Sequence, residues 1–158
     1  MIWTPERIAA AQTEAHRWHG TPHRDRMALP GIGIDCINYV YEILIAAQIL
    51  ERAPLGYYNT RVGLHDGNDR LKRAFKECAT VLEQPASDPQ FGDIVIFKTG
   101  AFSGHCGIVL TGGDIWHSLA GRTVTRSNFA EWIPKIDCLL RIEQEGLIGV
   151  PMEAAKKI

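Results

Sequence analysis

The sequence has 158 residues, 46% of them hydrophobic and 22% charged, with a formal net charge of -1. This length is typical of one domain, and scattered Lys and Arg in a near-neutral chain do not form the basic surface that captures nucleic acid. Because no run of about 18 apolar residues is present, a membrane-spanning helix is excluded, and we expect one globular domain over residues 1–158 with neither a nucleic-acid nor a membrane partner.

The N-terminal part predicts a helix followed by a loop. Thr4-Pro5-Glu6 is typical of a helix start, with an N-cap, a proline at the first helical position and an acid in the first turn. The helix is predicted to run to about Trp18 and to end at Gly20. Residues 19–35 are rich in Pro and Gly, which predicts a surface loop of the kind that often carries function.

Two further helices are predicted before the sequence changes character. Residues 36–50 are apolar on nearly all sides, as expected of a helix buried in the middle of a domain. A third helix is predicted between about residues 66 and 82, because Leu71, Ala74, Phe75 and Cys78 follow the spacing of one helical face. Cys78 is therefore expected in the core.

The C-terminal half predicts a small antiparallel sheet. Short β-rich runs are separated by glycine-containing turns, which favour hairpins over parallel crossovers. The predicted strands span residues 93–98, 105–110, 114–118, 123–127 and 137–142. Helices followed by an antiparallel sheet indicate an α+β domain, and residues 146–158 are expected to be a tail with at most a short helix.

Cys36 occupies an unusual position, directly after the glycine-rich loop and the capping residue Asp35, at the start of the buried helix. The positive end of a helix stabilises a thiolate, and its N–H groups can bind the oxyanion that forms when a thiolate attacks a carbonyl. The alternative is a buried structural cysteine. Cys36 is therefore the candidate nucleophile.

Two histidines of the six fall at strand positions and can serve as a base for this thiol. His105 is close to glycines that allow another element to approach, and His117 follows one hairpin later. The two imidazoles can thus lie on adjacent strands, where one fixes the tautomer of the other. A hydrogen-bonded structural role is the alternative for each of them.

A metal site is not indicated. The four cysteines, Cys36, Cys78, Cys106 and Cys138, form no CxxC pair, and no HExxH helix occurs. His105 and Cys106 are adjacent in a strand and point to opposite faces, so they would not share an ion. We expect free thiols, with Cys106 and Cys138 in the core, and no metal.

Three motifs together resemble the bacterial and phage cell-wall cysteine endopeptidases of the NlpC superfamily, in particular its phage-type branch. Residues 18–23 and 31–36 are similar to the Gly-Thr-Pro loop and the Asp-Cys helix start. Residues 92–97 are similar to the Gly-Asp-Leu-Val-Phe-Phe strand. Residues 103–110 and 115–118 resemble the His-Val-Gly-Ile strand and the strand with the third catalytic residue. The resemblance implies a papain-like fold with N-terminal helices packed on a small antiparallel sheet.

The resemblance also implies an activity and a set of site residues. Cys36, His105 and His117 match the family's catalytic triad, and the implied reaction is hydrolysis of the amide between γ-D-glutamate and a diamino acid in peptidoglycan stem peptides, with no metal or cofactor. His23 stands where the family often has a tyrosine that lines the active site. We expect His23, Asp35 and Trp116 to contact substrate.

Two alternatives to this activity remain open at this stage. One is an amidase or acyl transferase with another substrate, and the other is a non-catalytic phage-tail or wall-binding module. The first residues lack the features of a secretion signal, so we expect cytoplasmic synthesis, with delivery to the wall by a phage tail or a secretion system.

Overall fold

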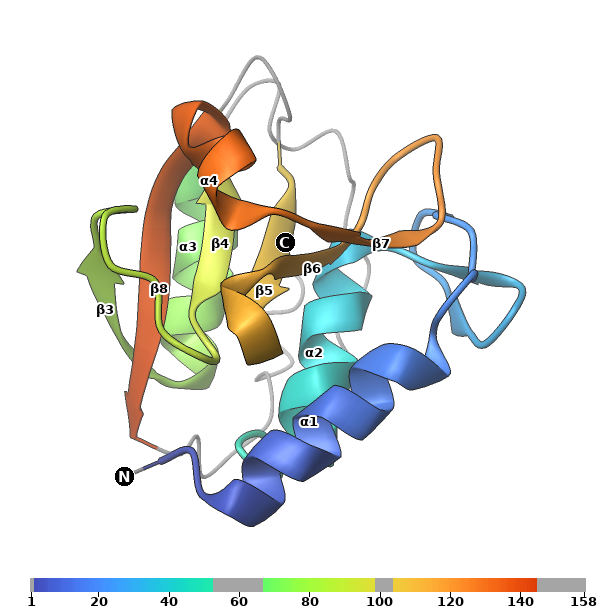
Figure 1. The fold of residues 1–158 in the computed structure, drawn as a ribbon, viewed down its shortest axis with the longest axis horizontal. Helices are drawn as coiled ribbons and strands as arrows, with labels where there is room; N and C mark the ends of the chain where they lie inside the picture. Colours follow the sequence, from blue (N-terminus) through green and yellow to red (C-terminus); the bar gives the residue numbers. More distant parts are fainter. Residues whose placement is uncertain (1, 53–66, 99–103, 145–158) are drawn as a thin grey trace.

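The computed structural model of the protein describes residues 2–52, 67–98 and 104–144, without the side chains of residues 67–70, 77, 78 and 144. It is an α+β fold in which helices precede and cover an antiparallel sheet (Figure 1). Helix α1 (Pro5–Arg17) begins as predicted, because the Thr4 side chain accepts a hydrogen bond from the N–H of Arg7. The predicted tail lies outside the described residues.

Helix α2 (Cys36–Ala46) begins at the predicted residue and ends four residues earlier than predicted. Gln48 adopts a positive φ of 57°, and the N–H of Ile49 bonds to the carbonyl of Leu44, which closes the helix end. A glycine usually occupies such a position, so the sequence carried no signal for this stop.

The predicted loop over residues 19–35 contains a small ribbon. Strands β1 (Ala28–Leu29) and β2 (Gly33–Ile34) pair antiparallel within it. The ribbon is anchored at its base, where the N–H of Ile34 bonds to the carbonyl of Pro22. The loop therefore leads into α2 as an ordered segment.

Helix α3 (Gly67–Cys78) is shorter than predicted, because strand β3 (Thr80–Gln84) begins where the helix was expected to continue. Leu71, Ala74 and Phe75 are buried as predicted, while the side chain of Cys78 lies outside the described part of the chain. No Gly or Pro separates helix from strand, and β3 is a mostly exposed edge strand, so its hydrophobic pattern was weak.

The five predicted strands are confirmed and form one six-stranded antiparallel sheet with β3. In chain order they are β4 (Ile94–Phe97), β5 (Cys106–Val109), β6 (Ile115–Ser118), β7 (Val124–Ser127) and β8 (Ile136–Gln144). The strand order is β3-β8-β4-β5-β6-β7, with β5 and β6 next to each other in the interior of the sheet. The expected turn after residue 98 lies outside the described residues.

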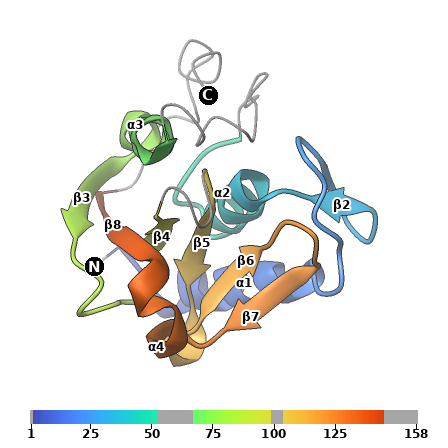
Figure 2. The ribbon, with the colours of Figure 1, turned by 90° about the horizontal axis from the view of Figure 1, so that it is seen from above.

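The two faces of the sheet carry different parts of the core. Side chains alternate along each strand, so Ile96, Cys106 and Ile108 face α2, whereas Val95, Phe97 and their neighbours face away. Figures 1 and 2 show α2 against β5 and β6, and α4 (Phe129–Trp132) beside the far face. Two short 3₁₀ turns, Thr111–Gly113 and Ile133–Lys135, complete the connections.

None of the helices in the described ranges combines the length and apolarity needed to cross a bilayer.

Candidate active site

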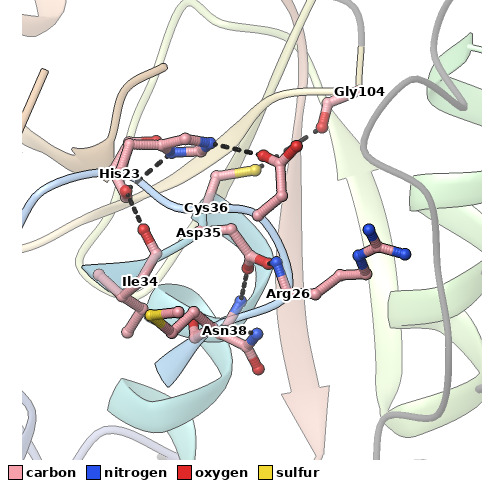
Figure 3. A network of polar contacts seen from close by, with 10 residues as sticks. His23, Arg26, Ile34, Asp35, Cys36, Asn38 and Gly104 are labelled. Carbon is pink, nitrogen blue, oxygen red and sulfur yellow. Dashed lines mark hydrogen bonds and ion pairs between the residues drawn. The ribbon is translucent and has the colours of Figure 1, made fainter. Parts of the chain in front are cut away.

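Asp35 fixes the start of α2. Its side chain is fully buried, and its two oxygens accept hydrogen bonds from the backbone N–H of Asn38, at 2.8 Å, and of Arg26, at 2.6 Å. The first contact caps the helix, and the second ties the preceding loop to it (Figure 3). Cys36 is consequently held at the first helical position, beside N–H groups that the helix itself does not use.

The sulfur of Cys36 contacts the residues on both sides of His105. Its thiol donates a hydrogen bond to the carbonyl oxygen of Gly104 over 3.7 Å (Figure 3), and it lies close enough to Cys106 to help raise the pKa of the Cys106 thiol. The Cys36 side chain is almost entirely covered, with 4% of its surface exposed. The start of α2 and the start of β5 therefore meet at this sulfur.

His105 and His117 lie together, as predicted from their strands. Nε2 of His105 is 2.8 Å from Nδ1 of His117, and both rings are buried. Their rings contact Phe97, so they belong to the sheet face that points away from α2. His105 directly precedes the first residue of β5. It is therefore next to Gly104, whose carbonyl contacts Cys36.

Burial favours the neutral form of both imidazoles. It lowers the pKa of His105 well below its ordinary value, and the neighbouring His117 and His23 lower it further. Burial also lowers the pKa of His117 to about 4, with a smaller contribution from Arg122. Both rings are thus uncharged near neutral pH, and His105 is a potential proton acceptor.

Three residues that the sequence did not single out surround the His117 ring. Nε2 of His117 is 2.8 Å from Oγ of Ser127. Phe97 stacks on the ring at 5.6 Å and 10°, and Trp132 meets it edge-on at 5.2 Å. The only sequence signal for Ser127 was its place in a predicted strand that pairs with the strand of His117.

His23 lies in the segment that precedes α2 and is bound to β6. Its Nδ1 is 2.9 Å from Oγ of Ser118, and its Nε2 is 3.3 Å from a carboxylate oxygen of Asp25. The Ser118 hydroxyl in turn donates to the carbonyl of Ile34 at 2.6 Å. Figure 3 shows His23 beside the start of α2 with Cys36 and Gly104.

The other two residues expected to contact substrate have different surroundings. Asp35 is occupied by the backbone contacts described above. Trp116 is buried on the α2 side of the sheet, 5.0 Å from the ring of His16 and 5.5 Å from the guanidinium of Arg126. Its role in substrate binding stays a prediction.

Cys106 and Cys138 are buried as expected, and burial raises the pKa of both thiols, that of Cys138 to about 12. Within the described ranges, no group of three or more His, Cys, Asp or Glu side chains is arranged to hold a metal ion. The side chains that the structure brings together here include a buried thiol and two imidazoles.

Comparisons with known proteins identify relatives of this fold. The model described as the NlpC/P60 family matches residues 13–137. The NlpC/p60 domain of the peptidoglycan hydrolase SagA superposes with a TM-score of 0.57 at 18% identity, over 85% of this chain and 97% of that one. None of the curated proteins matches the chain.

A second solved structure, described as similar to lipoprotein and of the NLP/P60 family, comes from Staphylococcus aureus subsp. aureus Mu50. It superposes with a TM-score of 0.58 at 19% identity, over 89% of this chain and 42% of that one. The two likenesses confirm the predicted papain-like α+β fold.

Proposed function

The chain belongs to the NlpC/P60 family, and we propose that it is a cysteine hydrolase that cleaves an amide bond in bacterial cell-wall peptides. Cys36 is the nucleophile, His105 the base and His117 the residue that orients the base. The observation that carries this proposal is the sulfur of Cys36 against the carbonyl oxygen of Gly104, while the next residue, His105, bonds to His117.

The proposed reaction begins with proton transfer from the Cys36 thiol to His105, and the thiolate attacks the substrate carbonyl. The backbone N–H of Cys36, at the start of α2, stabilises the resulting oxyanion. His105 then protonates the leaving amine, which leaves an acyl-enzyme. Water attacks this thioester with His105 again as base, releasing the acid and restoring the thiol.

The positions of Cys36 and His105 define what this mechanism requires. The Cys36 sulfur lies on the α2 side of the sheet, and the His105 ring contacts Phe97 on the other side. Because His105 directly precedes β5, the mechanism requires its ring to reach the Cys36 sulfur around the start of this strand.

The proposed substrate is a peptidoglycan stem peptide, cleaved between γ-D-glutamate and a diamino acid. Family membership supports this choice, together with the description of the SagA domain as part of a peptidoglycan hydrolase. His23 is proposed to contact the substrate, because it is only partly buried and lies next to the nucleophile. The phage-type branch and delivery by a phage tail or secretion system remain proposals as well.

Digestion of purified muropeptides tests the activity. The intact protein should release a fragment that ends at the γ-D-glutamyl residue, identified by mass spectrometry, and Cys36→Ala should release none. Cys138→Ala is the matched control, because it removes another buried thiol, on β8, and should keep the activity. Equal cleavage by Cys36→Ala and the intact protein would exclude the thiol mechanism.

A further inference from the structure

Ser127 is placed by the sheet register next to His117. Strands β6 and β7 pair antiparallel, with His117 opposite Thr125 and Ile115 opposite Ser127. Residues at such diagonal positions share one face of the sheet and lie within reach of long side chains. The hydroxyl of Ser127 accordingly lies 2.8 Å from Nε2 of His117, a normal hydrogen-bond length.

The aromatic contacts of the His117 ring fix the orientation of its plane, but they do not determine which ring nitrogen carries the hydrogen. Phe97 stacks on one side and Trp132 meets the ring with its edge. These aromatic carbons interact almost equally with either neutral tautomer. The polar partners of the ring are His105 at Nδ1 and Ser127 at Nε2. The Ser127 hydroxyl gives a hydrogen on Nε2 an acceptor, without which that buried N–H would be unsatisfied.

The reaction needs one particular tautomer. For Nδ1 of His105 to accept the thiol proton, the hydrogen of the neutral ring must be on Nε2, from which it donates to Nδ1 of His117. The single hydrogen of His117 is then on Nε2 and donates to Oγ of Ser127. If His117 instead carried its hydrogen on Nδ1, it would donate to His105, and Nδ1 of His105 would no longer be a base.

We propose that Ser127 is a positioning residue of the site, which accepts the hydrogen of His117 Nε2 and thereby keeps Nδ1 of His105 ready to take the thiol proton. This role rests on the proposed hydrolase function. Ser127 exchanges no proton itself: the proton passes from the sulfur of Cys36 to His105 and then to the leaving amine.

Three variants test this role. Ser127→Ala removes the hydroxyl, Ser127→Thr retains it, and Thr125→Val is the matched control. Thr125 lies on β7, as Ser127 does, and is directly opposite His117 on β6. Its hydroxyl donates to the carbonyl of Thr123 instead of contacting the ring. With muropeptide substrate, Ser127→Ala should lower kcat about tenfold with little change in KM, as expected for loss of one hydrogen bond that maintains a reactive state.

Ser127→Thr should recover most of this loss, and Thr125→Val should match the intact protein. A second measurement needs no substrate: nitrogen-15 NMR of the imidazoles reports which ring nitrogen carries hydrogen. His117 should be protonated at Nε2 in the intact protein and in Thr125→Val. In Ser127→Ala it should populate both tautomers.

The proposal would be overturned by unchanged kcat and an unchanged His117 tautomer in Ser127→Ala, or by an equal loss of kcat in Thr125→Val. Failure of the proposed function has a different signature. In that case Cys36→Ala retains full cleavage or no muropeptide is cut, and the NMR comparison still shows whether Ser127 selects the tautomer of His117.

Discussion

Nε2 of His105 and Nδ1 of His117 lie 2.8 Å apart, so one hydrogen is shared between these atoms when both rings are neutral. A doubly protonated pair would place two N–H groups against each other in the core. Protonation of this pair in acid should therefore both destabilise the fold and remove the proposed base.

Acid should destabilise the protein through His117. Its pKa is lowered from about 6.5 to about 4 by burial, so below pH 6.5 the unfolded chain binds a proton that the folded chain does not. The stabilisation is present above pH 6.5 and is lost as the pH falls toward 4. The free energy of unfolding should decrease by up to about 1.4 kcal/mol per pH unit from this group alone.

Urea unfolding between pH 7.5 and 4.5 measures this dependence. His117→Asn should show a shallower slope than the intact protein, whereas substitution of the exposed His19 by Asn should leave the slope unchanged. An identical slope in His117→Asn would contradict the assignment of the acid sensitivity to this ring.

Alkylation should distinguish Cys36 from the other buried cysteines. Burial raises the pKa of Cys106 well above its ordinary value and that of Cys138 to about 12, so both are thiols at neutral pH. A nucleophilic Cys36 should react first with iodoacetamide at pH 7, because the thiolate is the reactive form. Peptide mapping by mass spectrometry checks the order, and labelling of Cys106 or Cys138 before Cys36 would contradict it.

Removal of the Asp35 carboxylate should affect both stability and activity. Asp35→Ala loses the cap of α2 and the contact with the N–H of Arg26, which should cost about 2 to 4 kcal/mol of unfolding free energy. Since the same contacts hold Cys36 in place, kcat should fall as well.

Thr4→Ala is the matched control for this cap. Thr4 caps α1 through the N–H of Arg7, and its loss should cost about 1 kcal/mol. Its kcat should equal that of the intact protein, because α1 starts at a distance from Cys36 along the chain and contributes no residue to the site. Urea unfolding and muropeptide cleavage measure the two effects, and a Thr4→Ala enzyme as impaired as Asp35→Ala would show that general destabilisation causes the loss.

The features that the sequence predicted well have strong local signals. The start of α2 was readable because Asp35 is a good N-cap, and the strands were readable because glycine turns separate short apolar runs. The pairing of His105 with His117 followed from two such strands joined by a single hairpin. Each of these inferences required only residues that are near one another in the chain.

The features that the sequence did not predict depend on tertiary contacts or on residues with weak preferences. Strand β3 is stabilised by pairing with β8, from the far end of the domain, and Gln48 ends α2 without the usual glycine. Ser127 is a common residue at a strand end. Its importance appears only when the register places it against Nε2 of His117.

Gly107 offers a test of how closely β5 and β6 must approach. It lies between His105 and Val109 on the face of the imidazole pair, and a Cβ there would be 2.8 Å from Cγ2 of Ile115 and 3.0 Å from Cβ of His117. Gly107→Ala should therefore push β6 away from β5 and lengthen the contact between His105 and His117. We expect a loss of about 1 to 3 kcal/mol in unfolding free energy and a decrease in kcat of about tenfold or more.

Gly113→Ala provides the comparison, because Gly113 has a φ of 76° but no atoms within 4 Å of an added Cβ. It should lose about 1 kcal/mol from backbone strain alone and keep the kcat of the intact protein. Urea unfolding and muropeptide cleavage separate the two variants. If Gly107→Ala cleaved as fast as Gly113→Ala, close contact between the two imidazoles would not be required for the reaction, and the orienting role of His117 would have to be abandoned.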